Sequence, residues 1–324
     1  MIVSVIIPSY NSAKWLPRAI RSVLAQSRPA DELIVVDDGS TDNSAEVCSQ
    51  FSDRLRYVRR ENGGLAAARN TGAAVSSGDW LLFLDADDTL TPNALESLSR
   101  TAEDSRAGVV YGFVLQRHAR DVDAQLHSRP YAVGSPPTPA KANFWWTSIC
   151  TAGSAFIHRS LNEAVGGFDE AFAQVEDCEY WLRCGVIAPF VHCGEMVLDK
   201  TYSPFSLGQQ LEGSIWFRLQ LQLKFLLWCR HRKIDTGFLD ASEADIIDHA
   251  LTRIHRQRCW SVLGPVLRVA RRQNVRTAWY FRSLFLHKWL QATRRLPHES
   301  DRCKDVYRSW LDAEKGVTSV VCSS

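Results

Sequence analysis

The chain has 324 residues, of which 45% are hydrophobic and 23% are charged, and its formal net charge is +2. This composition provides an ample core for one large or two moderate domains, and it excludes disordered and fibrous proteins. The charge is unevenly distributed, because residues 1–200 carry 18 Lys and Arg against 25 Asp and Glu, whereas residues 201–324 carry 20 against 11. We therefore expect the two parts of the chain to meet different partners.

Nine cysteines are scattered along the chain without a Cys-x-x-Cys pair. This spacing favours reduced, buried thiols over a disulfide framework or a zinc site, and Cys178, Cys184 and Cys193 form the closest cluster. The first apolar run follows Met1 directly, and no apolar run reaches the length of a bilayer. We expect a cytoplasmic protein.

The N-terminal segments alternate between strand and helix. Residues 3–7 form a β-branched run that ends at Pro8, which predicts a buried parallel strand. Apolar residues then recur at helical spacing over 15–24, with Asn11 or Ser12 as the candidate cap. The turn between strand and helix would lie at the carboxyl edge of the sheet, where open α/β sheets bind ligands; a simple cap and turn is the alternative.

A second strand is predicted at 33–36, and the helix after it carries Val47, Cys48 and Phe51 on one side. Asp38 lies between them, at the tip of the strand. A carboxylate there can accept hydrogen bonds from a nucleobase N–H or a ribose hydroxyl. Acids before a helix also serve as plain capping groups, so both interpretations stay open.

A third strand at 55–58 leads through Gly63 and Gly64 into an alanine-rich helix at 65–75. The N-terminus of this helix could hold phosphate through its free backbone N–H groups. The chain contains neither a Gly-x-Gly-x-x-Gly fingerprint nor a P-loop. In the plainest interpretation, Arg69 is a surface arginine of this helix.

Five consecutive apolar residues at 80–84, too few for a helix, predict a central strand buried on both faces. Asp85, Asp87 and Asp88 follow at its carboxyl end. Paired carboxylates such as those of Asp85 and Asp87 suit Mg²⁺ or Mn²⁺, which bind oxygen ligands together with the phosphates of a substrate. A solvated acidic turn before the next helix is the alternative.

Further elements are predicted as a helix from Pro92, a strand at 109–115 and a short strand at 155–157. Residues 117–143 lose periodicity and are rich in Pro, Ser, His and Arg. A loop of this length in a compact domain is usually functional, so we expect a lid or a segment that contacts the acceptor.

Helical spacing over 176–184 places Asp177 on the same face as Tyr180, Trp181 and Cys184. Aromatic burial raises the pKa of a carboxylate whereas a helix N-terminus lowers it, so Asp177 could remain ionised and still accept a proton. The alternative is an acid that only complements the helix dipole. Glu176 is the rival candidate for the base.

Six motifs together resemble those of family 2 glycosyltransferases with the GT-A fold, and they occur in the family's order over roughly residues 1–200. The motifs are Val5-Ile6-Ile7-Pro8-Ser9-Tyr10-Asn11, Val35-Val36-Asp37-Asp38-Gly39-Ser40-Thr41-Asp42, Asn62-Gly63-Gly64-Leu65-Ala66-Ala67-Ala68-Arg69-Asn70, Leu84-Asp85-Ala86-Asp87-Asp88, Gly166-Gly167-Phe168-Asp169, and Glu176-Asp177 before Trp181-Leu182-Arg183. Each motif is weak alone, but their joint occurrence is highly specific.

The resemblance implies an α/β fold, with a Rossmann-like, mixed and mostly parallel sheet flanked by helices, in a catalytic domain over residues 1–204. It implies an inverting, metal-dependent hexosyltransferase that uses a nucleotide-diphosphate sugar, with UDP-linked sugars favoured, and Mn²⁺ or Mg²⁺. The acceptor would be a hydroxyl of a cell-surface glycan or a lipid-linked precursor. Carried over by motif, the donor-nucleotide residues are Pro8, Tyr10, Asn11, Asp38, Arg69 and Asp85. The metal residues are Asp85 and Asp87, and the catalytic base is Asp177.

Two departures refine this expectation. Cys178-Glu179-Tyr180 stands where relatives often show an acidic or leucine-containing pattern, and the Gln-x-x-Arg-Trp motif of processive synthases is absent, so we expect one sugar to be added per encounter.

A nucleotidyltransferase would need a glycine-rich first loop with a basic residue, which Pro8-Ser9-Tyr10-Asn11 lacks. The non-enzyme alternative is an inactive scaffold that binds sugar nucleotides.

Residues 205–324 are predicted to form a basic helical region. Residues 253–295 hold eleven Arg or Lys and no Asp or Glu, interleaved with Trp and Phe. Basic helices with an aromatic face suit an anionic membrane surface, so we expect peripheral binding at the inner face of the cell membrane without a crossing. A helical bundle with a solvated basic exterior is the alternative. Nucleic acid is not an expected partner, because no recognised binding module is present.

Overall fold

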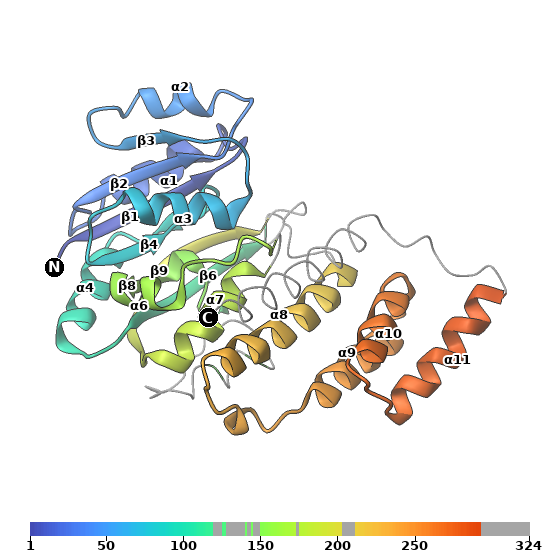
Figure 1. The fold of residues 1–324 in the computed structure, drawn as a ribbon. Coiled ribbons are helices and arrows are strands. Elements are labelled where there is room, and N and C mark those ends of the chain that lie inside the picture. Colours follow the sequence, from blue (N-terminus) through green and yellow to red (C-terminus); the bar gives the residue numbers. More distant parts are fainter. Residues whose placement is uncertain are drawn as a thin grey trace, which may run out of the picture. The chain divides into compact units, whose positions relative to one another are not determined.

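The structure is a computed structural model that describes residues 1–118, 125–127, 140, 144, 150–172, 175–202 and 211–292. The chain divides into two compact units, Met1–Ser206 and Leu207–Ser324, which are described separately (Figure 1).

The first unit is built on one nine-stranded sheet with the strand order β3-β2-β1-β4-β8-β6-β9-β5, and β7 pairs with β6. The strands are β1 (Val3–Ser9), β2 (Glu32–Asp37), β3 (Arg56–Arg59), β4 (Trp80–Phe83), β5 (Thr89–Leu90), β6 (Val109–His118), β7 (Gln125–His127), β8 (Ala155–His158) and β9 (Phe190–Tyr202). Strands β3, β2, β1 and β4 are mutually parallel, so their carboxyl ends meet at one edge. The β8 strand runs antiparallel to both of its neighbours, and β6 and β9 are parallel again.

Helices cover both faces of this sheet (Figure 1). They are α1 (Leu16–Leu24), α2 (Ser44–Ser49), α3 (Leu65–Val75), α4 (Ala94–Asp104), α6 (Arg159–Val165) and α7 (Glu176–Ile187). Successive residues of a strand point to opposite faces, so β1 supplies Val5 and Ile7 to the core beneath α1 and α4. Ile6 faces the other core, which α3, α6 and α7 cover.

The apolar runs of the sequence correspond closely to these elements. The central strand predicted at 80–84 is β4, which is buried throughout, and the helix predicted at 65–75 is α3 with the same bounds. The first strand extends past its predicted end and includes Pro8. Proline is tolerated there because the pairing of β1 with β4 stops at Ile6 and Phe83, whereas its pairing with β2 continues.

The predicted cap of the first helix is wrong. The α1 helix begins at Leu16, and the residue before it, Trp15, makes no side-chain cap hydrogen bond. Asn11 has a left-handed backbone with φ of 49°, and its Oδ1 accepts a hydrogen bond from Thr41 N at 2.8 Å. The Ser12 carbonyl already accepts hydrogen bonds from the backbone N–H of both Trp15 and Leu16. A turn therefore separates the candidate caps from the helix, and Asn11 instead joins the loop after β1 to the loop after β2.

The second unit is helical, as expected. Its elements are α8 (Leu211–His231), η3 (Gly237–Leu239), α9 (Glu243–Gln257), η4 (Trp260–Val262), α10 (Leu263–Arg272) and α11 (Ala278–Ala292). Fully buried residues such as Ile246, Leu263 and Val266 form its core. Among the described helices, none combines the length and hydrophobicity needed to cross a bilayer.

Candidate functional site

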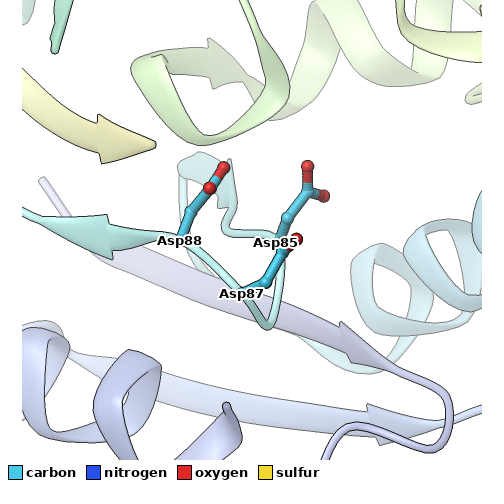
Figure 2. Close-up of side chains that lie close together, drawn as sticks. All are labelled: Asp85, Asp87 and Asp88. Atoms are coloured by element: carbon cyan, nitrogen blue, oxygen red, sulfur yellow. The ribbon is translucent and has the colours of Figure 1, made fainter. Parts of the chain in front are cut away.

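Three aspartates gather in the turn that follows β4. Leu84 N donates to Ile6 O at 2.9 Å, which extends the strand to its last residue, and Asp88 N then donates to Asp85 O at 3.0 Å to close the turn. One carboxylate oxygen from each of Asp85, Asp87 and Asp88 lies within 4.8 Å of the others. The carboxylates of Asp85 and Asp88 point to the same side of the turn (Figure 2). The expected juxtaposition at the carboxyl edge of the parallel strands is present.

Among the described residues, two cations contact the carboxylates of this cluster. Arg69 Nη2 lies 2.7 Å from Asp85 Oδ1, and Lys200 Nζ lies 3.5 Å from Asp85 Oδ2 and 2.9 Å from Asp88 Oδ2. Both oxygens of Asp85 therefore face a positive charge. Burial alone would raise the pKa of Asp85, but Arg69 and Lys200 outweigh that effect and hold its pKa below the usual value.

The carboxylates of Asp87 and Asp88 have oxygens that lack a hydrogen-bond donor among the described residues. No side chain in the described part of the chain donates a hydrogen bond to the Asp87 carboxylate, and Asp88 Oδ1 is buried without a partner. Burial and the charge of Asp85 raise the pKa of Asp87, and burial raises that of Asp88 to about 7 although Lys200 acts in the opposite direction. Hard oxygens that lack donors and repel one another fit a divalent cation. The donor set therefore suits Mn²⁺ or Mg²⁺, with Asp87 and Asp88 offering the open oxygens.

Arg69 connects this cluster to the start of α7. The residue is 1% exposed, which excludes its interpretation as a surface arginine, and its guanidinium lies 5.1 Å from the Phe168 ring centroid. Its Nη1 lies 2.7 Å from Glu176 Oε1. The helix α3 reaches this position because its small residues let it approach the sheet: a Cβ added at Gly72 would lie 2.2 Å from Ile6 Cγ2.

Glu176 and Asp177 have different surroundings. Glu176 is buried and forms an ion pair with Arg69. Burial and the charge of Asp177 raise the pKa of Glu176, and the charge of Arg69 acts in the opposite direction. Asp177 is half-buried, and its Oδ1 accepts a hydrogen bond from Cys178 N at 2.7 Å. Of the predicted helical face, Tyr180, Trp181 and Cys184 are fully buried. Asp177 is therefore the more accessible acid of the pair.

The predicted nucleotide residues lie at the same edge of the sheet. Pro8 is buried, whereas Tyr10 and Asn11 are exposed beyond it, and Asp38 N donates to Ser9 O at 2.8 Å. Their contact with a nucleotide stays a prediction.

The Asp38 carboxylate also has a structural role. It accepts hydrogen bonds from Gly63 N, Gly64 N at 2.7 Å and Arg60 Nη1 at 2.8 Å. Gly64 precedes α3 with φ of 92°. Asp38 therefore orders the glycine turn from which α3, and with it Arg69, begins.

Lys200 is a site residue that no pattern in the sequence indicates. It lies in β9, and β5 pairs antiparallel with β9 at Thr89–Asp199, which brings Lys200 beside Asp88. The two residues are 112 positions apart. A lysine near the end of a strand carries no local pattern that predicts this contact. Most of the expected loop over 117–143 lies outside the described residues. Strand β7 is a described segment within this range.

Comparison with known proteins identifies relatives of this chain. The family model described as Glycosyl transferase family 2 matches residues 4–166. Glycosyltransferase GlyG of Streptococcus pneumoniae serotype 4 is 39% identical over 115 residues, which cover 34% of this chain and 38% of GlyG. An uncharacterized glycosyltransferase of Rickettsia conorii is 31% identical over 212 residues, covering 62% of this chain and 34% of that protein. The chain thus spans about a third of the length of these curated relatives.

A solved structure resembles the chain over most of its length. The crystal structure of S. aureus TarS 1-349 in complex with UDP-GlcNAc superimposes with a TM-score of 0.58 at 18% sequence identity, covering 91% of this chain and 92% of that one. At this identity the likeness concerns the fold.

Proposed function

Because the chain belongs to glycosyl transferase family 2, we propose that it transfers a sugar from a nucleotide-diphosphate sugar, UDP-linked in particular, to an acceptor hydroxyl of a cell-surface glycan or a lipid-linked precursor. The fold is of the GT-A type. The N-terminal part of the chain would be the catalytic unit. The observation that carries the proposal is the acidic cluster at the carboxyl edge of the parallel strands, joined by one buried arginine to a second pair of acids on α7.

The donor would bind at the acidic cluster. Asp87 and Asp88, with Asp85 beside them, would hold Mn²⁺ or Mg²⁺, which supplies Lewis-acid neutralisation of the diphosphate. Pro8, Tyr10 and Asn11 would form the wall against the nucleoside. Arg69 holds the Asp85 carboxylate in a fixed orientation from the side of α3. The support for this arrangement is that Tyr10, Asn11 and the three aspartates lie in loops after β1 and β4, which end at the same edge of the sheet.

Asp177 would accept the proton of the acceptor hydroxyl. The oxygen of that hydroxyl attacks the anomeric carbon, the bond from that carbon to the diphosphate oxygen breaks, and the electron pair leaves with the nucleoside diphosphate. A single displacement of this kind inverts the anomeric configuration. Asp177 is favoured over Glu176 because Glu176 is buried and bound to Arg69, whereas Asp177 is half-buried with no ion pair among the described residues. A general base must reach the proton that it removes.

The second unit would place the enzyme on an anionic membrane surface, at the inner face of the cell membrane. On α11, Phe281 is 55% exposed and Phe285 is 77% exposed, four residues apart and so on the same face of the helix. Arg282 and Lys288 are exposed on the same helix, and Arg268, Arg271, Arg272 and Arg276 are exposed on and after α10. Exposed aromatic side chains among basic ones suit the headgroup region of anionic lipid.

Calorimetry with a panel of nucleotide sugars, with Mn²⁺ and with EDTA, tests the proposed donor. We expect one UDP-sugar to bind with Mn²⁺ and to bind much more weakly with EDTA. Product analysis with the donor that binds would then follow transfer to hydroxyl acceptors. Failure of every nucleotide sugar to bind, in the presence of Mn²⁺ and with the chain folded, would contradict the proposed function.

A further inference from the structure

We propose that Lys200 is a built-in counter-ion of the acidic cluster, which competes with the divalent metal and thereby makes metal binding depend on the donor nucleotide. The inference rests on the proposed function, because it assumes that metal and nucleotide share this site. Lys200 is not part of any motif in the chain. Its presence predicts that metal affinity and nucleotide affinity are coupled, which the three aspartates alone would not require.

The position of the ammonium group is the first argument. Lys200 Nζ contacts Asp88 at 2.9 Å and Asp85 at 3.5 Å, and the side chain is only 19% exposed. Asp85 and Asp88 belong to the triad whose oxygens lie within 4.8 Å of one another. A metal ion bound by that triad would therefore lie close to the Lys200 ammonium. Two cations that close repel each other strongly where water is largely excluded.

The distribution of charge is the second argument. The other cation at the cluster, Arg69, is shared with Glu176, whereas Lys200 contacts two members of the triad. Without a counter-ion, three carboxylates at this spacing would be costly to keep ionised in a half-buried site. Lys200 stabilises the cluster when no metal is bound. When a metal ion binds the carboxylate oxygens, the contacts between Lys200 and these carboxylates must weaken.

The chemistry of the donor completes the argument. A nucleoside diphosphate brings several negative charges to the metal, and these offset the repulsion between the metal and the Lys200 ammonium. The flexible lysine stem also allows the ammonium to turn from a carboxylate towards a phosphate oxygen. Metal and nucleotide should therefore each raise the affinity of the other, by the same factor in both directions. Metal alone should bind weakly.

The test measures Mn²⁺ binding to the full chain by calorimetry or by electron paramagnetic resonance, without and with saturating UDP. The variants are Lys200→Met, which keeps the length of the side chain without its charge, Lys200→Gln as a second neutral variant, and Lys200→Arg, which keeps the charge. Lys233→Met is the matched control, because Lys233 is an exposed lysine of the second unit. Circular dichroism establishes that each variant is folded.

We expect the neutral variants to bind Mn²⁺ in the absence of UDP roughly tenfold more tightly than the original chain, or tighter still, since one repelling charge has been removed. The factor by which UDP raises Mn²⁺ affinity should shrink correspondingly. Lys200→Arg should retain most of the coupling, and Lys233→Met all of it. A purely structural lysine would lower both affinities together and leave their coupling factor unchanged.

Three results would overturn the inference. One is unchanged or weaker Mn²⁺ binding by folded neutral variants without UDP. Another is an unchanged coupling factor. The third is a loss of UDP affinity that is equal with and without metal, which would make Lys200 a plain phosphate ligand. If the original chain binds neither Mn²⁺ nor UDP, the proposed function itself fails, and this outcome is distinct from the other three.

Discussion

Arg69 and Glu176 are separated by 107 positions in the sequence, and their side chains meet at 2.7 Å in the interior of the first unit. The same guanidinium holds Asp85 at 2.7 Å through its other terminal nitrogen. One rigid, planar group thus sets the spacing between the proposed metal side and the proposed base side of the site. Arginine suits this task because its nitrogens point in fixed directions, which a lysine ammonium does not provide.

Arg69→Met should destabilise the first unit strongly, because it leaves Glu176 without its buried counter-charge and leaves Asp85 with Lys200 alone. Loss of one partner of a buried ion pair costs about 3–5 kcal/mol. Urea denaturation measures the change in the free energy of unfolding. The exposed Arg54 is the matched control, and Arg54→Met should change stability by less than about 0.5 kcal/mol. Similar costs for the two variants would contradict the bridging role of Arg69.

Asp87→Asn should remove the dependence of nucleotide binding on the metal. Asp87 offers a carboxylate to which no described side chain donates a hydrogen bond, and the amide is a much weaker ligand for Mn²⁺. Measured by calorimetry, the UDP affinity of Asp87→Asn in the presence of Mn²⁺ should equal that of the original chain in EDTA. Asp53→Asn, at an exposed position, is the control and should behave as the original chain. Equal affinities with and without EDTA in both the original chain and Asp87→Asn would refute the metal assignment.

Asp177→Asn should lower turnover by roughly 10² to 10⁴ while donor affinity stays near that of the original chain, because the amide keeps the shape but cannot accept the proton. Glu176→Gln is the companion variant. It should also disturb Arg69 and therefore lower stability, which Asp177→Asn should not. If Glu176→Gln alone abolishes turnover, the roles of the two acids are reversed. Weakened donor binding by Asp177→Asn would place that residue on the nucleotide side.

Tyr57→Phe should destabilise the chain in a pH-dependent way. Burial raises the pKa of Asp37, but hydrogen bonds from Ser40 and from the Tyr57 hydroxyl outweigh burial and lower it from 3.8. A group with a lowered pKa in the folded state stabilises the protein above the pKa of the unfolded state and loses that effect as pH falls. The cost of the substitution should be about 1–3 kcal/mol near neutral pH and should shrink below about pH 4. Chemical denaturation over a pH series measures it, and a constant cost would contradict the explanation.

Simultaneous replacement of Phe281 and Phe285 by Ser should abolish the proposed membrane binding. The full chain should sediment with vesicles that contain anionic lipid, and less so as salt increases, because the attraction is screened. Ile187→Ser is the control, because Ile187 is an exposed apolar residue of the first unit. Equal sedimentation with neutral vesicles, or none with anionic ones, would favour a helical bundle whose basic face meets only water.

Local patterns in the sequence determined most of the fold of the first unit. Residues 80–84 were recognisable as a buried central strand because an uninterrupted apolar run of that length fits a strand covered on both faces. Leu65–Val75 was recognisable as a helix because alanines follow two glycines that break the preceding strand. Parallel alternation of strand and helix then placed the acids after β4 at the edge where ligands bind, without any knowledge of distant contacts.

The tertiary structure alone decided which charges meet. Arg69 resembles a surface arginine within its own helix, and only the packing of α3 and α7 on one face of the sheet buries it between Asp85 and Glu176. Lys200 reaches Asp88 because β9 pairs with both β5 and β6. Hydrophobic periodicity depends on residues a few positions apart, so a short segment of sequence reveals it. Ion pairs across more than a hundred residues depend on strand order and register, which no local pattern encodes.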